Sequence, residues 1–191
     1  AAQLGYQVGL VEKNALGGDC LNEGCIPTKT LLKNAKVYRV MKHASAYGIH
    51  IDDSAVTFNW TDMLSRKNKV IKTLTDGVKG LLKKNGVTVH NGYGEVLNPT
   101  TVKVGDETLT TKYLILATGA SPVIPNIPGL KEGFERQFIY TYSSLLNYPK
   151  VPTSLTIIGG GVIGLEFATL FSSFGTKVTV IEGTPNILPG F

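Results

Sequence analysis

The spacing of apolar residues changes several times along the first half of the chain, and each change predicts a new element. A short apolar run predicts a strand over 6–12. Apolar positions at helical spacing then predict one helix up to about Tyr47 and a long helix over 61–85, each followed by a glycine that ends it. From 87 to 109, valine and leucine alternate with polar residues, which predicts a small antiparallel meander.

The second half of the chain contains the longer apolar runs. Residues 112–120 predict a buried strand, and a proline-rich irregular segment follows it. A strand over 155–158, a helix over 165–174 and a strand over 177–181 then occur in close succession. A strand, helix and second strand in this order are typical of a parallel α/β unit.

A glycine-rich loop lies between the first strand and the helix of that unit. Gly159, Gly161 and Gly164 fit the spacing G-x-G-x-x-G. In this context the first glycine makes a tight turn, the second lets backbone N–H groups approach a pyrophosphate, and the third allows close helix packing. Glu182 ends the second strand, where a carboxylate accepts a hydrogen bond from a ribose 2′-hydroxyl and repels a 2′-phosphate. No arginine follows it, so NAD is favoured over NADP.

The fold class that follows is α/β, with two Rossmann-like dinucleotide-binding domains and a small antiparallel β-meander in the first. We expect the first domain over 1–146 and the start of the second over 147–191. Both domains look incomplete, because the chain opens on the second half of a strand–helix–strand unit and ends soon after Glu182. A first strand and its glycine loop, and any targeting segment, would precede residue 1.

Composition narrows the choice of function only slightly. The chain has 191 residues, of which 42% are apolar and 22 are glycine, as in a folded α/β protein. No apolar run is long enough to span a membrane. The net charge of +5 comes largely from one predicted helix. Its basic residues are Arg66, Lys67, Lys69, Lys72, Lys79, Lys83 and Lys84. We expect a solvated helix face rather than a partner-docking or nucleic-acid surface, since aromatic residues are not interleaved.

Both cysteines of the chain, Cys20 and Cys25, lie at the start of a predicted helix. Unpaired backbone N–H groups there favour a thiolate, so the two thiols are candidates for electron exchange. Positions five apart do not share a helix face, and a distorted turn at Gly24 and Pro27 would be needed to join them. Lys29 lies one turn beyond Cys25. A structural disulfide and a zinc site remain alternatives, although the three histidines show no ligand spacing.

The stretch Gly17-Gly18-Asp19-Cys20-Leu21-Asn22-Glu23-Gly24-Cys25-Ile26-Pro27-Thr28-Lys29 resembles the redox-active disulfide signature of the flavoprotein disulfide reductases. Within that family it is most similar to the dihydrolipoamide dehydrogenases. Two positions depart from the family pattern. Asp19 stands where the family mostly has Thr, and Glu23 stands where it mostly has an apolar residue. Both add negative charge near the thiols, which tends to raise the pKa of a thiol.

The resemblance implies cofactor contacts for several residues. Glu12 would bind the ribose of FAD, and the Gly17-Gly18 backbone would pass close to the cofactor. Gly94 and the segment Thr118-Gly119-Ala120 would meet the adenine part, while Lys29 would pair with the isoalloxazine and Glu166 would face the nicotinamide. On sequence alone, Glu12 could equally be a solvated strand end, Gly94 a turn or bulge glycine, and Glu166 a charge that favours the helix N-terminus.

The activity implied by the resemblance is the oxidation of protein-bound dihydrolipoamide. Electrons would pass through a Cys20–Cys25 disulfide and FAD to NAD⁺, with Cys20 as the interchange thiol and Cys25 facing the flavin. A lipoyl domain of a 2-oxoacid dehydrogenase or glycine cleavage complex would be the partner of a cytoplasmic homodimer. The alternatives are an NADPH-dependent reductase of the glutathione or mercury type, and a nucleotide-binding fragment without turnover. The fragment alone is expected to be inactive.

Overall fold

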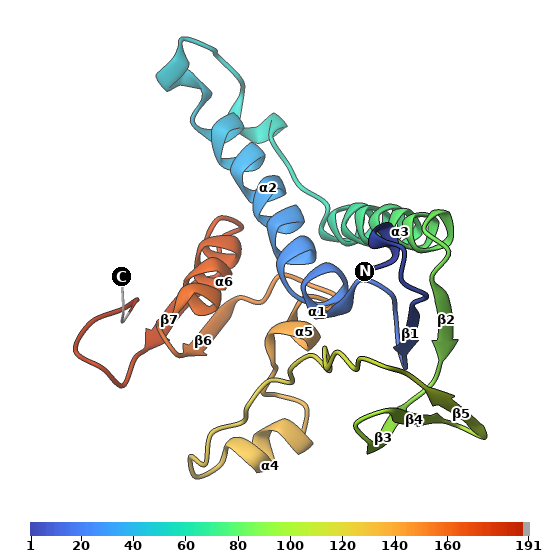
Figure 1. Cartoon of the computed structure of the whole chain (residues 1–191). Coiled ribbons are helices and arrows are strands. Elements are labelled where there is room, and N and C mark those ends of the chain that lie inside the picture. The colour runs from blue at the N-terminus through green and yellow to red at the C-terminus, as the bar shows by residue number, and fades with distance from the viewer. Residues whose placement is uncertain (189–191) are drawn as a thin grey trace. The chain divides into compact units, whose positions relative to one another are not determined.

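The computed structural model describes residues 1–188 (Figure 1). Contacts between residues divide the chain into two compact units. Unit 1 comprises Ala1–Asn22 and Ile71–Ser121. Unit 2 comprises Glu23–Val70 and the chain from Pro122 onward. The long helix α3 (Trp60–Lys84) contributes residues to both. The predicted domain division after residue 146 stays a prediction.

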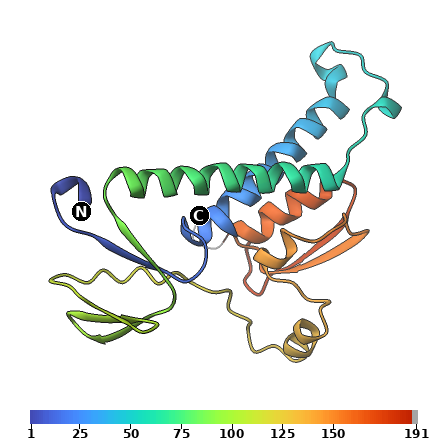
Figure 2. The same cartoon turned by 90° about the vertical axis from the view of Figure 1, so that its right-hand side faces the viewer.

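Unit 1 contains two small sheets. Strand β1 (Gly9–Glu12) pairs in parallel with β2 (Thr88–Asn91). The second sheet is antiparallel and three-stranded, as the meander prediction requires (Figure 2). Its strands are β3 (Gly94–Asn98), β4 (Thr101–Val104) and β5 (Glu107–Thr110). A 3₁₀ turn η1 (Ala2–Leu4), closed by Gly5 at φ +84°, and the short helix α1 (Gly18–Asn22) complete the unit.

The first part of the predicted meander is placed differently in the structure. The meander prediction began at Val87, but residues 88–91 form β2 beside β1 instead of joining the antiparallel sheet. Gly92, with φ +146°, follows β2, and the chain enters β3 two residues later. Alternation of apolar and polar residues shows that a segment is a strand, but it does not show which neighbour the strand pairs with.

The predicted buried strand over 112–120 is wrong for this chain. These residues belong to no strand, and Tyr113, Ile115 and Leu116 are 65%, 79% and 68% exposed. The reason is the lack of a pairing partner. Within residues 1–188 the strands pair only as β1–β2, β3–β4–β5 and β6–β7, so an apolar segment of the right composition has no neighbour to complete its hydrogen bonds.

Unit 2 is built from helices and a two-stranded parallel sheet. The helices are α2 (Cys25–Lys42), the first part of α3, α4 (Leu130–Glu135), α5 (Tyr142–Leu145) and α6 (Val162–Ser172). The strands are β6 (Ser154–Ile158) and β7 (Lys177–Ile181), and two 3₁₀ turns are η2 (Ala44–Tyr47) and η3 (Asp53–Ala55). Helix α2 ends at Lys42, earlier than the predicted end near Tyr47. The 3₁₀ turn η2 follows it, and Gly48, with φ +74°, ends that turn.

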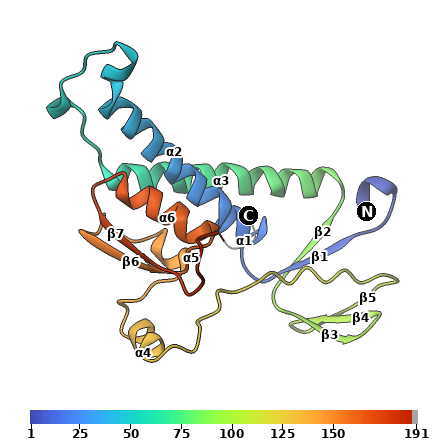
Figure 3. The same cartoon turned by 90° about the vertical axis from the view of Figure 1, so that its left-hand side faces the viewer.

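Helix α6 lies between α2 and the β6–β7 pair, as Figures 1 and 3 both show. Most of its residues are apolar, and Phe167, Leu170 and Phe171 are buried along it. They meet Leu31 and Ala35 of α2, which are each 1% exposed. An apolar helix buried on two sides is held by the removal of its side chains from water, at about 2–3 kcal/mol for each large one.

The expectation of a solvated basic face on α3 is wrong at one position. Lys72 conforms to it, since its side chain is 76% exposed and pairs with Asp76. Lys67 does not, because it is only 2% exposed. Its ammonium donates hydrogen bonds to the Leu146 carbonyl oxygen and to Asn147 Oδ1, at 2.9 and 2.6 Å. Sequence spacing alone did not separate this lysine from its neighbours.

We predict that Phe171→Ala lowers the free energy of unfolding by about 3–5 kcal/mol, because Phe171 is fully buried against α3 and α6 neighbours and leaves a cavity. Denaturant unfolding followed by the fluorescence of Trp60, the only tryptophan, measures the change. Val123, 86% exposed in the same unit, offers the control Val123→Ala, expected to change the value by less than about 0.5 kcal/mol. Equal effects of the two variants would contradict the placement of the core.

Candidate functional site

The glycine loop leads from β6 into α6 with the geometry expected of its motif. Gly159 has φ +108°, a conformation that L side chains rarely adopt, and its N–H donates to the Ile181 carbonyl oxygen at 2.8 Å. Gly161 is the N-cap residue of α6, and a Cβ atom added there would meet nothing within 4 Å. The space beside the helix N-terminus is therefore open, as an approaching anion requires.

Gly164 has a different role, in the first turn of α6. A Cβ atom at this position would collide with the Gly159 carbonyl oxygen and lie 3.2 Å from Ile157 Cγ2. The helix therefore approaches β6 closely enough that only glycine fits. This is the packing function that the sequence assigned to the third glycine of the motif.

Glu182, directly after β7, is fixed by hydrogen bonds from three donors. Its Oε2 accepts from the Gly160 N–H at 2.6 Å, and its Oε1 accepts from the N–H and hydroxyl of Thr184 at 2.8 and 3.0 Å. The Gly160 N–H is the main cause of a lowered Glu182 pKa, and the Thr184 donors add to it. The carboxylate is thus held ionised and oriented toward the loop, in the state that accepts hydrogen bonds from a ribose.

Two of these partners were not foreseen from the sequence. Gly160, the variable position between the motif glycines, is buried, and a Cβ atom there would lie 3.0 Å from Ile187 and 3.1 Å from Glu182 Oε2. The Thr184 contact has a local signal, because a threonine two residues after an acidic side chain commonly donates back to it. The Gly160 contact has none, since it joins positions 22 residues apart.

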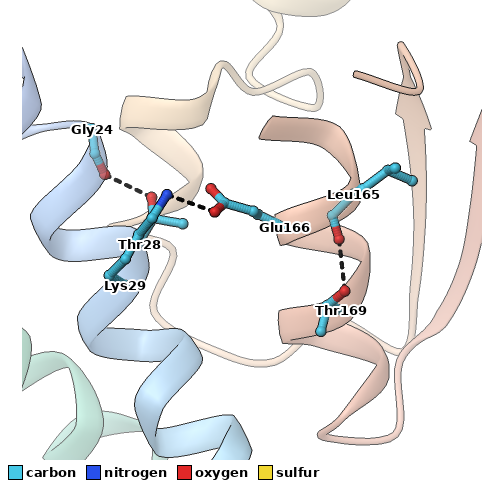
Figure 4. Close-up of polar contacts among 6 residues, drawn as sticks. All are labelled: Gly24, Thr28, Lys29, Leu165, Glu166 and Thr169. Carbon is cyan, nitrogen blue, oxygen red and sulfur yellow. Dashed lines mark hydrogen bonds and ion pairs between the residues drawn. The ribbon is translucent and has the colours of Figure 1, made fainter. Parts of the chain in front are cut away.

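Lys29 and Glu166 form an ion pair of 2.6 Å between α2 and α6 (Figure 4). Lys29 lies in the second turn of α2, and Glu166 lies on α6 shortly after the glycine loop. The lysine side chain is 56% exposed and the glutamate side chain 23%, so the pair itself contributes little to stability. Its importance is positional. It places a cation from the cysteine-bearing helix beside the helix that follows the glycine loop.

An apolar hollow of about 360 Å³ lies beside this ion pair. It is lined by Leu32, Val162, Leu165, Glu166, Thr169 and Leu188. Five of these six residues belong to α2 or α6, and Glu166 supplies the carboxylate. A concave surface that is mostly apolar, with one fixed polar group, is the general form of a site for a flat ring.

The two cysteines lie on different elements. Cys20 is in the short helix α1, and Cys25 is the first residue of α2. Gly24 separates the helices with φ −118° and ψ −103°, so the distorted turn that the sequence required does occur there. Pro27 follows in the first turn of α2, where its missing N–H costs no helical hydrogen bond. Both cysteine side chains are exposed, and Cys25 lies at the N-terminus of α2.

The FAD-contact candidates other than Cys25 and Lys29 all lie in unit 1. Glu12 is half-buried at the end of β1, and its Oε1 accepts a hydrogen bond from the Asn14 N–H at 2.8 Å. Gly17 and Gly18 have φ values of +105° and +70°. Gly119 has φ +75° with open space around its Cβ position, and Thr118 and Ala120 beside it are exposed. These positions allow close backbone approach, and their contacts with a cofactor stay predictions.

Gly94 has a structural explanation of its own. A Cβ atom there would lie 3.1 Å from Val11 Cγ1 and 3.6 Å from Val102 Cγ1. The glycine therefore lets β3 approach these valines closely. This favours the packing alternative for Gly94, and a contact with adenine stays a prediction.

In the chain up to residue 188, no group of three or more His, Cys, Asp or Glu side chains could hold a metal ion. None of the helices within that stretch is long and apolar enough to cross a membrane.

We predict that Glu182 stabilises unit 2 in a pH-dependent way. Its pKa is lowered in the folded state, so its contribution is present above the ordinary value of 4.5 and is lost as pH falls through the folded value. The difference in free energy of unfolding between the wild type and Glu182→Gln should therefore shrink below pH 4.5. Thr184→Val, which removes one donor only, should give a smaller effect of the same sign. A difference that stays constant from neutral to acidic pH would contradict the hydrogen-bond assignment.

The family model described as "Pyridine nucleotide-disulphide oxidoreductase" matches residues 1–191. A dihydrolipoyl dehydrogenase of Acholeplasma laidlawii is 52% identical over 99% of this chain and 56% of its own length. The dihydrolipoyl dehydrogenase of Mycoplasma pneumoniae is 43% identical over 95% of this chain and 40% of its own length.

Solved structures agree with the sequence relatives. The HOCl-induced flavoprotein disulfide reductase RclA of Escherichia coli is 33% identical to this chain, with a TM-score of 0.78. The match covers 98% of this chain and 39% of RclA. Its Cu(II) complex gives a TM-score of 0.79 at the same identity and coverage. The chain thus spans 39–56% of the length of these relatives.

The resemblance at the cysteine stretch and the geometry of the glycine loop therefore agree with matches over the whole chain: this chain belongs to the pyridine nucleotide-disulphide oxidoreductase family, whose members here include flavoprotein disulfide reductases and dihydrolipoyl dehydrogenases.

Proposed function

We propose that this chain carries the redox-disulfide and nucleotide-binding portion of an NAD-dependent dihydrolipoamide dehydrogenase. The observation that carries the proposal is the Lys29–Glu166 ion pair. It joins the helix that begins at Cys25 to the helix that follows the dinucleotide loop, so Cys25 and the glycine loop lie in one unit.

The thiols would carry out a disulfide exchange. Dihydrolipoamide gives up two electrons and two protons and becomes the lipoamide disulfide, while the Cys20–Cys25 disulfide takes them up and becomes a dithiol. Cys20 would attack or be attacked by substrate sulfur, and Cys25 would face the flavin. Family membership implies FAD with a pyridine nucleotide, and FAD when bound would carry the electron pair from the dithiol to that nucleotide.

The chain's own residues would hold the nicotinamide nucleotide in three places. The pyrophosphate would lie at the open space beside Gly161, at the start of α6. Glu182, held ionised by the Gly160 N–H, would accept hydrogen bonds from the ribose and repel a 2′-phosphate, which favours NAD over NADP. The apolar hollow beside Glu166 would take the nicotinamide ring.

Several residues of unit 1 have the properties that contacts with a flavin nucleotide require. Glu12 presents a half-buried carboxylate at a strand end, and Gly17, Gly18 and Gly119 allow close backbone approach. Lys29 would stabilise negative charge on the reduced isoalloxazine, as a fixed cation can. The carboxylate of Glu182 argues against the alternative of an NADPH-dependent reductase.

The partners follow from the relatives' names rather than from this chain's geometry. We propose that the protein acts on a lipoyl domain, of either a 2-oxoacid dehydrogenase or a glycine cleavage complex, and that it works as a homodimer in the cytoplasm. The curated relatives named dihydrolipoyl dehydrogenase support the lipoyl substrate class.

We predict that Cys20 and Cys25 titrate as one pair with the lipoamide and dihydrolipoamide couple. They are the only cysteines, so alkylation followed by mass spectrometry reads them without interference. Both thiols should be alkylated together as the couple becomes reducing, because one disulfide holds both. Cys20→Ser is the control, and it should leave Cys25 open to alkylation at every ratio of the couple. Independent alkylation of the two thiols in the wild type would overturn the redox-pair proposal.

We further predict that Gly161→Ala weakens NADH binding at least about tenfold without unfolding the protein. Its φ of −77° is compatible with alanine and its Cβ position is open, so the new methyl group would occupy the space proposed for the pyrophosphate. Calorimetry would measure affinity. Gly80→Ala, in α3 with an equally open Cβ position, is the matched control and should bind as the wild type does. Unchanged affinity in Gly161→Ala would contradict the placement of the nucleotide.

A further inference from the structure

Helix α3 presents two hydrogen-bond donors to the same short stretch of chain. The Trp60 Nε1–H donates to the Tyr148 carbonyl oxygen at 2.9 Å. Two turns further along α3, the Lys67 ammonium donates to the Leu146 carbonyl oxygen and to Asn147 Oδ1. Residues seven positions apart lie on the same face of a helix, so Trp60 and Lys67 both reach acceptors in residues 146–148. We call residues 146–153 the crossover, because they lead from α5 into β6.

Both donors act in the interior of unit 2. The exposed fraction is 6% for Trp60 and 2% for both Lys67 and Leu146. A buried ammonium is unfavourable unless acceptors replace its water, and desolvation lowers the pKa of Lys67 accordingly. A methionine or leucine would fill the same space at no such cost. The lysine is therefore best explained by what it binds.

The crossover determines where the nucleotide-binding elements lie. Two of its carbonyl oxygens accept hydrogen bonds from residues where β7 begins. Thr176 Oγ1 donates to the Pro152 carbonyl oxygen at 2.7 Å, and the Lys177 N–H donates to the Thr153 carbonyl oxygen at 3.0 Å. It then continues directly into β6 and the glycine loop. The ring of Trp60 also packs against Phe171 and Phe174, at centroid distances of 5.8 Å each. Helix α3 thus holds the crossover and the C-terminal end of α6 together.

We propose that Trp60 and Lys67 form a two-point clamp on the crossover, which fixes α6 against α2 and so keeps Glu166 at Lys29. They are positioning residues, because neither lies at the glycine loop or at the ion pair. The clamp itself is a statement about unit 2 alone. Its consequence for nucleotide binding rests on the proposed function.

The test must separate hydrogen bonding from packing. Lys67→Met keeps an unbranched apolar stem and removes the donors, and Trp60→Phe keeps an aromatic ring and removes the Nε1–H. Lys72→Met on the exposed part of the same helix is the matched control. Global stability is not the readout, because replacing a buried charge by an apolar side chain can be neutral or even stabilising.

The readout is backbone amide hydrogen exchange in the whole chain, measured by mass spectrometry. The amides of Leu146, Asn147 and Tyr148 donate to carbonyls of residues 142–145, so they are protected while the crossover stays in place. We expect Lys67→Met and Trp60→Phe each to speed their exchange about tenfold or more relative to Lys72→Met. Amides of β4 in unit 1 should be unaffected and serve as the internal reference.

Exchange at 146–148 that is unchanged in both variants would overturn the clamp, as would an equal increase throughout the chain. If Lys67→Met does not fold, Trp60→Phe decides alone, because its ring contacts with Phe171 and Phe174 are retained. NADH affinity is the second readout, and it should fall between about 2-fold and about 30-fold in Lys67→Met. Faster exchange with unchanged affinity would overturn the link to the nucleotide site. A wild type that binds no NADH would overturn the proposed function while the exchange data still test the clamp.

Discussion

The structure of unit 2 depends on the burial of α6 between α2 and the β6–β7 pair. Leu170 and Phe171 of α6 are fully buried, and Leu31 and Ala35 of α2 are nearly so. Because this apolar contact fixes one helix against the other, two groups with different chemistry are brought together. One is the turn at which Cys25 begins α2, and the other is the glycine loop at which α6 begins. The Lys29–Glu166 pair lies between them and depends on the same packing.

Much of the geometry at the proposed nucleotide half of the site could be predicted from the sequence, because it is local. Gly159, Gly161, Gly164 and Glu182 occur within 24 positions, and each has a conformational or charge requirement that few residues satisfy. The structure shows the turn at Gly159, the close packing at Gly164 and the hydrogen bonds to the carboxylate of Glu182. The break between the helices of Cys20 and Cys25 was predictable for the same reason, since Gly24 and Pro27 mark it.

The contacts that the sequence did not predict join residues far apart in the chain. Lys29 and Glu166 were each assigned to a cofactor ring, but 137 positions separate them and nothing local indicates that they pair. Lys67 was grouped with six other basic residues, because helical spacing does not show which of them faces the crossover. The strand expected over 112–120 failed for a related reason. Its apolar residues suit a strand, but a strand also needs a neighbour, and composition cannot supply one.

The central claim is that Cys25 and the nicotinamide end of the nucleotide share one site in unit 2. A nitroxide attached to Cys25 in a Cys20→Ser background would test it, through the broadening of the proton resonances of bound NADH. The account predicts stronger broadening of the nicotinamide protons than of the adenine protons, since Glu166 and the apolar hollow contact Lys29 and Leu32 of α2, the helix that begins at Cys25. Equal broadening of the two rings, or stronger broadening of adenine, would contradict it.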